Sequence, residues 1–200
     1  MSFNRKDLKM AAKEQLKGNV GIYFGVTILL SLILSFSSIT IIGPLLISGS
    51  IMLGLTLLIL EIVRTKKGNL ETGFKGFKQF GSSLGAYFFM GIFIGLWSIL
   101  FVIPGIIAGF RYSMTFFVLA DNPTMSGLAA IRKSKEMMKG HKWELFVLLI
   151  SFFWWYILGT ITFGLAYIYV IPYMEATIAN FYEKLKEEQP VAEVIDDKKE

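Results

Sequence analysis

The chain contains no cysteine and a single histidine, His141, among its 200 residues. The absence of cysteine excludes disulfide bonds, thiolate metal sites and cysteine nucleophiles. One histidine is too few for a multi-histidine metal site. The sequence also contains no Ser-His-Asp arrangement and no phosphate-binding glycine loop. We therefore expect a protein without a metal or cofactor that is not an enzyme.

Charged residues are scarce, at 18% of the chain against 54% hydrophobic residues, and the mean hydropathy is +0.58. A soluble domain is closer to about a quarter charged. Three long stretches, residues 18–60, 79–110 and 145–174, contain no charged residue at all. A helix needs about 20 apolar residues to cross a bilayer. The composition therefore predicts an integral membrane protein.

Three hydrophobic blocks, at about residues 20–63, 83–120 and 145–182, are each too long for one straight span. A helix of that length would reach about 60 Å, twice the thickness of the hydrocarbon core. Glycine and proline near the middle of each block predict a turn there, at Gly43, Pro44, Pro104, Gly105, Gly159 and Gly164. We therefore predict an all-α transmembrane bundle of three helical hairpins, with six spans, in one membrane domain over residues 1–184.

Lysine and arginine lie almost entirely in the segments that flank these blocks, and the predicted turns contain none. Short basic loops stay on the cytoplasmic side of a membrane. Both termini of this multi-pass protein are therefore predicted to be cytoplasmic. Shallow re-entrant hairpins are the alternative, because some legs have only about 15–18 residues. Residues 185–200 are expected to form a disordered cytoplasmic tail.

The blocks also resemble repeats of one hairpin unit. Lys17, Lys78 and Lys139 precede them at a constant spacing of 61 residues. A fixed period is typical of a repeated supersecondary unit, although any three hairpins with equal loops would show one. Glycine pairs at G-x-x-x-G spacing also predict close helix packing. These pairs are Gly21/Gly25, Gly91/Gly95 and Gly105/Gly109.

A short, basic, amphipathic segment precedes each hydrophobic block. Such helices lie at the level of the lipid headgroups, where anionic lipid attracts their basic side chains. Basic loops also suit nucleic acid, but these lie next to predicted spans, so anionic phospholipid is the nearer partner and no nucleic acid is expected. A role in topology alone is the plainer interpretation. The residues predicted to contact anionic lipid are Lys75, Lys78, Arg132, Lys135 and Lys139.

Arg111 lies inside the predicted fourth span, near the bilayer centre, where an arginine costs about 2.5–3.5 kcal/mol. Glu175 lies at a similar predicted depth in the sixth span, which runs in the same direction. We therefore predict an intramembrane Arg111–Glu175 ion pair that faces the bundle interior. The pair either fixes how two hairpins dock or lines a polar path for a substrate or protons. A water-accessible cavity around Arg111 would favour the second role.

Three segments of the chain resemble a known family. They are PGIIAGFRYSMTFFVLADNP (residues 104–123), GLAAIRKSKEMMKGHKWELFVLLISF (127–152) and TFGLAYIYVIPYMEATIANFYEKL (162–185). The family is an uncharacterised bacterial one of six-span inner-membrane proteins, catalogued only as a domain of unknown function. It is similar to the membrane domain of some glycerophosphodiester phosphodiesterases and, more distantly, to Yip-type membrane proteins. The resemblance implies a bacterial, helical, multi-pass membrane protein and implies no activity.

The sequence therefore predicts a non-enzymatic protein of the bacterial plasma membrane. It would act through lipids, a membrane-protein partner or a second copy of itself, as an accessory or stress-related factor. A small transporter or permease-like carrier, with Arg111 and Glu175 in its path, is the alternative. An enzyme that acts on lipid headgroups is a third interpretation, which requires several carboxylates to converge on one cleft.

Overall fold

The computed structural model describes residues 4–39, 42–100 and 102–188, and these residues form α-helices and one 3-10 helix without any strand. All-α architecture is therefore confirmed for the described part of the chain. The helices are α1 (Arg5–Gln15), α2 (Val20–Ser37), α3 (Ile42–Thr65), α4 (Leu70–Phe74), η1 (Lys75–Gln79), α5 (Phe80–Leu100), α6 (Val102–Tyr112), α7 (Thr115–Asp121), α8 (Gly127–Met137), α9 (Lys142–Ile150), α10 (Phe153–Ile161) and α11 (Tyr167–Glu188).

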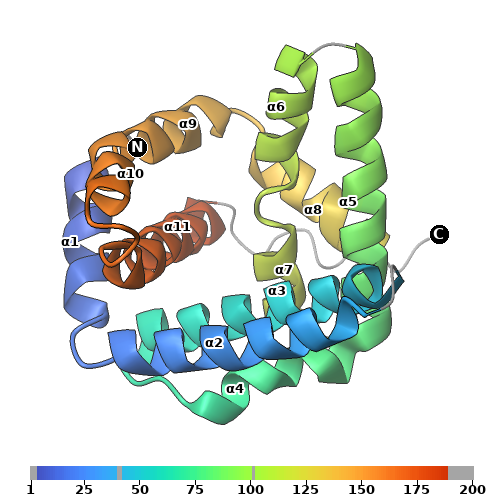
Figure 1. Cartoon of the computed structure of the whole chain (residues 1–200). Helices are drawn as coiled ribbons and strands as arrows, with labels where there is room; N and C mark the ends of the chain where they lie inside the picture. The colour runs from blue at the N-terminus through green and yellow to red at the C-terminus, as the bar shows by residue number, and fades with distance from the viewer. Residues whose placement is uncertain (1–3, 40–41, 101, 189–200) are drawn as a thin grey trace.

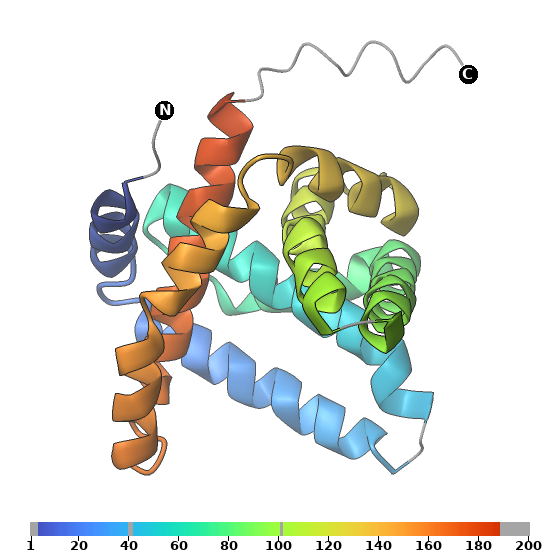
Figure 2. The same cartoon turned by 90° about the horizontal axis from the view of Figure 1, so that it is seen from above.

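The long helices pair into three hairpins, which point in different directions (Figure 1). The first pairs α2 with α3, the second pairs α5 with α6 and α7, and the third pairs α9 and α10 with α11. In Figure 1 the second hairpin stands upright while the first runs across the picture. Figure 2 shows the turns of the first and third hairpins at separate edges of the molecule. The hairpins therefore splay outward from a shared base.

Five helical segments are long and apolar enough to cross a membrane, which supports the prediction of a membrane protein. They are residues Val20–Ser37, Ile42–Thr65, Leu70–Ile99, Val102–Asp121 and Lys142–Ile161. The predicted sixth leg, α11, is not among them, and it carries Glu175 and Glu183 together with two lysines near its end. The number of spans and the side of each terminus stay predictions. Helix α11 also extends into the predicted tail as far as Glu188, and residues 189–200 lie outside the described residues.

The prolines expected in the first two turns lie inside helices instead. Gly43 and Pro44 lie in the first turn of α3, and Pro104 and Gly105 lie in the first turn of α6. Proline fits there because the first amide groups of a helix have no intrahelical acceptor. Residues 40, 41 and 101, at the tips of these hairpins, lie outside the described residues.

The third turn lies at Phe163 and Gly164, which have φ angles of 51° and 91°. The Gly164 N–H donates to the Gly159 carbonyl oxygen at 2.8 Å and closes the end of α10. Gly159 itself lies within α10, where the ring of Tyr167 packs against its Cα and leaves no room for a side chain. Glycine therefore serves the turn at position 164 and close packing at position 159.

The buried core lies at the base, where the hairpins meet, and the hairpin tips are exposed. Core residues come from the end of α3, from α7, from the start of α9 and from the second half of α11. Examples that are at most 1% exposed are Leu58, Leu119, Leu145 and Phe181. At the tips, apolar side chains have the opposite environment: Phe36 is 80% exposed, Ile99 85% and Phe163 99%.

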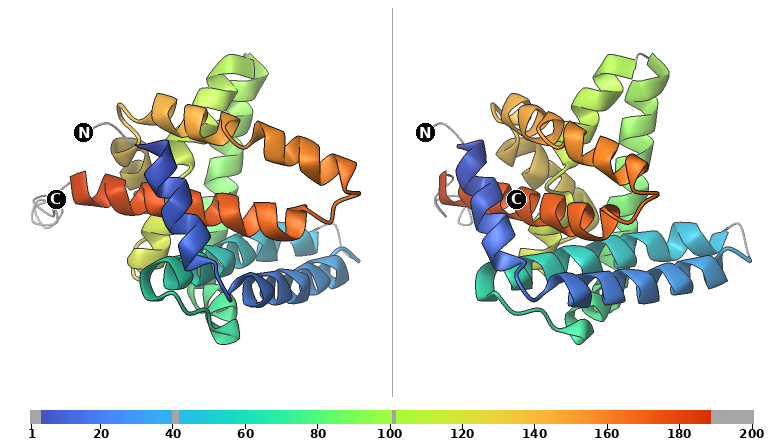
Figure 3. Two further views of the ribbon diagram at one scale, coloured as in Figure 1. Left: turned by 90° about the vertical axis from the view of Figure 1, so that its left-hand side faces the viewer. Right: turned by 60° about the vertical axis from the view of Figure 1, so that its left-hand side comes forward.

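The first and last helices of the described chain lie against each other at the base. Figure 3 shows α1 crossing α11. The Gln15 and Asn180 side-chain amides exchange two hydrogen bonds, with nitrogen–oxygen distances of 3.1 and 2.7 Å. Leu8 and Ala12 on the apolar face of α1, and Leu16 directly after the helix, are buried in the core. The amphipathic segment before the first hairpin is therefore part of the packed base.

Most close helix approaches use glycines outside the predicted pairs. Gly54 of α3 lies against the Gly73 carbonyl oxygen of α4, and Gly127 of α8 lies against the backbone of Ser82 and Ala86 in α5. A side chain at either glycine would collide with backbone. Of the predicted pairs, only Gly105 is closely approached, by Ser98. Open space surrounds the others, which are Gly21, Gly25, Gly91, Gly95 and Gly109.

Candidate functional site: the base cluster, two helix breaks and a cavity

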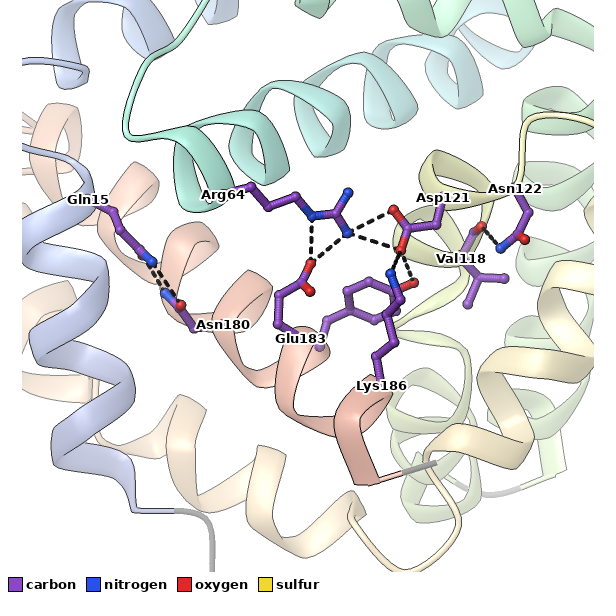
Figure 4. Close-up of polar contacts among 9 residues, drawn as sticks. Gln15, Arg64, Val118, Asp121, Asn122, Asn180, Glu183 and Lys186 are labelled. Atoms are coloured by element: carbon purple, nitrogen blue, oxygen red, sulfur yellow. Dashed lines mark hydrogen bonds and ion pairs between the residues drawn. The ribbon is translucent and has the colours of Figure 1, made fainter. Parts of the chain in front are cut away.

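Four charged side chains and one tyrosine hydroxyl at the ends of three helices converge in one base cluster, made of Arg64, Asp121, Tyr182, Glu183 and Lys186 (Figure 4). The Arg64 guanidinium lies 2.8 Å from an Asp121 oxygen and donates to Glu183 at 2.6 Å. Asp121 also accepts from Lys186 at 2.7 Å and from the Tyr182 hydroxyl at 2.9 Å. The cluster joins the ends of α3, α7 and α11, which are the returning legs of the three hairpins.

The sequence did not lead us to predict this cluster, although it contains one signal for it. Arg64, Asp121 and Glu183 each follow an apolar leg that returns from a hairpin turn. Because each of the three residues ends the returning leg of a hairpin, all three are expected at the same level of the base. Residues of opposite charge at one level can form ion pairs. The predicted Arg111–Glu175 pair was instead chosen because both residues lie at a similar depth inside the membrane.

The fourth leg is broken between α6 and α7, at Ser113 and Met114, where the sequence predicted a continuous helix. The buried Ser134 hydroxyl, from α8, bridges this break. It accepts from the Met114 N–H at 3.1 Å and donates to the Arg111 carbonyl oxygen at 2.9 Å. Ser134 therefore satisfies two backbone groups that the break takes out of the helical ladder.

The fifth leg has a similar break between α9 and α10, at Ser151 and Phe152. The Trp155 N–H bonds to the Phe152 carbonyl, so the Ser151 carbonyl loses its helical partner. Lys9 of α1 takes that place: its Nζ donates to the Ser151 oxygen at 2.9 Å and lies 4.0 Å from the centre of the Phe152 ring. At both breaks, a side chain from an amphipathic helix completes the backbone hydrogen bonding.

The predicted Arg111–Glu175 ion pair is not formed in this structure. Among the described residues, neither the Arg111 guanidinium nor the Glu175 carboxylate takes part in an ion pair or a side-chain hydrogen bond. The prediction assumed that a straight helix sets the depth of Arg111. The break that begins at Ser113 redirects this leg, and Arg111 instead lies in the last turn of α6.

Glu175 lies on the wall of a cavity of about 370 Å³ between the three hairpins. Helices α3, α6, α7, α9 and α11 all contribute to its lining. The lining residues are Met52, Thr56, Ile106, Gly109, Phe110, Ser113, Phe116, Phe117, Leu145, Leu149, Glu175 and Ile178. Glu175 is the charged residue of this set, and Ser113 belongs to the break in the fourth leg. The mostly apolar wall of the cavity therefore includes both the helix break at Ser113 and the Glu175 carboxylate.

The five residues predicted to contact anionic lipid are exposed side chains near the base. Lys75 and Lys78 lie in η1, Arg132 and Lys135 in α8, and Lys139 just after α8. Within the described residues, none of the five forms an ion pair with an acidic side chain. Their charge is therefore available to an external anion.

Acidic residues do not gather into a metal centre in the residues that the structure describes, where no group of three or more His, Cys, Asp or Glu side chains could hold a metal ion. The comparisons with known proteins give one positive finding. A family model described as "Protein of unknown function (DUF975)" matches the chain twice, over residues 1–108 and residues 99–189. No curated protein and no solved structure matches the chain.

Proposed function

The chain belongs to this family of unknown function, and we propose that it is a non-enzymatic, multi-pass protein of the bacterial plasma membrane that acts through lipids or membrane partners. Its role would be that of an accessory or stress-related factor. The observation that carries this proposal is the contrast between apolar, exposed hairpin tips and a charged, packed base. Contact of the Phe36, Ile99 and Phe163 side chains with water is unfavourable, and insertion of the tips into the hydrocarbon core of a bilayer would replace that water with lipid chains.

The proposal places the base on the cytoplasmic side, with both termini there. The exposed basic side chains of η1 and α8 support this side, because basic segments stay cytoplasmic and attract anionic headgroups. The proposed partners are therefore anionic lipids, with a membrane protein or a second copy of the chain as further candidates. A relation to the membrane domain of glycerophosphodiester phosphodiesterases and to Yip-type proteins is part of the same hypothesis.

Cysteine labelling tests this proposal directly, because the natural chain has no cysteine. One variant carries Phe163→Cys at the tip of the third hairpin, and a matched variant carries Lys135→Cys at the base. Each is treated with a membrane-impermeant maleimide in intact spheroplasts and in inverted membrane vesicles. We expect Lys135→Cys to react only in the inverted vesicles.

The Phe163→Cys result distinguishes a hairpin that spans the bilayer from a shallow re-entrant hairpin. Labelling in spheroplasts is expected if the hairpin spans the bilayer, and protection in both preparations until detergent is added is expected for a re-entrant hairpin. Recovery of the protein in the soluble fraction, or labelling of Lys135→Cys from outside, would overturn the proposal.

A small carrier is the second candidate function, and the cavity beside Glu175 favours it. Carriers bind substrates near broken helices, and the break at Ser113 reaches this cavity. A Ser113→Cys variant tests alternating access. A carrier exposes this position to the impermeant maleimide from both sides of the membrane in turn. Labelling from one side only contradicts the carrier.

A further inference from the structure

We propose that the cavity at Glu175 is a binding site for an ammonium group carried on an apolar body. The inference goes beyond the proposed function, because a site of this kind does not depend on how the hairpins sit in the bilayer. It starts from the chemistry of the cavity wall. Glu175 supplies a carboxylate, which carries a negative charge when it is ionised, and no cation of the described chain pairs with it.

The other side-chain polar groups of the wall, two hydroxyls, already donate their protons to backbone carbonyls in this structure. The Thr56 hydroxyl donates its proton to the Met52 carbonyl oxygen at 2.9 Å, and the Ser113 hydroxyl donates to the Phe110 carbonyl oxygen at 2.9 Å. Each hydroxyl therefore presents lone pairs to a ligand. A carboxylate and two acceptor hydroxyls match a ligand that donates hydrogen bonds and carries positive charge. They do not match an anion.

The rest of the wall is apolar and partly aromatic. Phe110, Phe116 and Phe117 line the cavity, and aromatic ring faces attract cations. Met52 and Ile106, on the same wall, are 44% and 52% exposed. Apolar side chains that are this exposed make the approach to the cavity suited to lipid-soluble ligands. The volume of about 370 Å³ falls within the usual range for small-molecule sites, which is about 300–1,000 Å³.

The ammonium group could belong to a free hydrophobic amine or to the headgroup of phosphatidylethanolamine. The test uses purified protein in dodecyl maltoside, a neutral detergent, and radiolabelled 4-phenylbutylammonium in equilibrium dialysis at mildly alkaline pH. The uncharged analogue 4-phenylbutanol corrects for partition into micelles. Competition with phosphatidylethanolamine, and in parallel with phosphatidylglycerol, separates the two sources.

Three variants locate the site. Glu175→Gln removes the charge and keeps the shape. Gly109→Leu fills the cavity and keeps the charge, because open space surrounds the position of a Cβ there. Glu136→Gln is the matched control: it removes an exposed carboxylate of α8 that does not line the cavity. Thermal unfolding of each variant verifies that it is folded.

We expect wild type and Glu136→Gln to bind the ammonium probe equally, and Glu175→Gln to bind it about tenfold more weakly, as for loss of a charged hydrogen bond. Gly109→Leu should also weaken binding, and 4-phenylbutanol should not distinguish the proteins. Equal binding by wild type and Glu175→Gln, or full binding by Gly109→Leu, would overturn the proposal. Displacement by phosphatidylethanolamine assigns the site to a lipid headgroup, and no displacement assigns it to a free amine.

Discussion

Arg64 and Asp121, which are 57 residues apart in the sequence, form an ion pair at 2.8 Å that joins the first hairpin to the second. Asp121 is the focus of the base cluster, since its side chain is only 12% exposed and two further donors reach it from α11. This geometry differs from that of an isolated surface pair, because the carboxylate of α7 accepts hydrogen bonds from two other helices, α3 and α11, at once.

Replacement of Asp121 by asparagine should therefore destabilise the folded base. Asp121→Asn leaves Arg64 and Lys186 without their shared charge, and we expect a loss of about 1–3 kcal/mol in the free energy of unfolding. A double-mutant cycle with Arg64→Met, measured by thermal unfolding in detergent, should show coupling. Glu14→Gln provides the control, because the Glu14–Lys66 pair is mostly exposed and should contribute less than about 1 kcal/mol. Equal losses in both variants would contradict a special role for the cluster.

Asn19 should be another position sensitive to substitution. Its side chain is 5% exposed and donates to the carbonyl oxygens of Gln15 and Lys66, while it accepts from the Gly68 N–H at 3.0 Å. Asn19→Ala leaves three partly buried backbone groups without their side-chain partner, which should cost about 1–3 kcal/mol. Asn122→Ala, which removes a single local bond from an exposed residue, should cost clearly less in the same unfolding assay. An unchanged free energy of unfolding in Asn19→Ala would show that water replaces these hydrogen bonds.

Two glycine-to-alanine substitutions should have opposite effects on stability. Gly54→Ala forces its methyl group into the Gly73 carbonyl and should separate α3 from α4, with a loss of about 1–3 kcal/mol. Gly91→Ala, within α5, meets open space and should stabilise its helix by up to about 1 kcal/mol. Comparison of the two melting temperatures provides the measurement. A stable Gly54→Ala would mean that the contact between α3 and α4 is loose.

Lys9→Met should loosen α1 from the break in the fifth leg. The substitution keeps an apolar stem and removes both the bond to Ser151 and the contact with the Phe152 ring, which together should contribute about 1 kcal/mol. Lys13→Met, at an exposed position of α1, is the control. Limited proteolysis near α1, followed over time, should cut Lys9→Met faster. Identical cleavage rates would show that α1 docks without this lysine.

The same lysine predicts a dependence of stability on pH. Burial lowers the pKa of the Lys9 ammonium from its usual value of 10.5, and the positive charge of Arg5 lowers it further. The unfolded chain therefore binds this proton more tightly, so the free energy of unfolding should rise as pH increases from the lowered pKa towards 10.5. Thermal melts across this window should show the rise in wild type and a smaller rise in Lys9→Met. Parallel curves would refute the assignment.

The hairpins could be predicted from the sequence because long uncharged runs with glycine or proline near their middle leave few other solutions. The two helix breaks could not be predicted in this way. Ser113–Met114 and Ser151–Phe152 contain neither proline nor glycine. Their backbone groups are satisfied by Ser134 and Lys9, which are distant in the sequence. A local pattern cannot indicate a break whose compensation comes from tertiary contact.

The same limit explains why the site predictions were only partly useful. Glu175 could be singled out because a carboxylate in an apolar helix needs an explanation, and the structure does place it on a cavity. Its predicted partner, Arg111, does not pair with it in this structure, because depth along a straight helix says nothing about rotation or breaks. Most of the glycine pairs failed similarly: Gly91 and Gly95 have the right spacing, but no described atom of another segment lies within 4 Å of a Cβ placed at either position.

The contact of α1 with α11 has a consequence for the order of events during synthesis. The ribosome synthesises α1 long before α11. The hydrogen bonds between Gln15 and Asn180 therefore cannot form until almost the whole chain has been made. During that interval the apolar face of α1 lacks its final protein cover, and a nearby membrane surface is the natural place to hold it. Helix α11 therefore closes the base, and premature termination within α11 would leave α1 undocked.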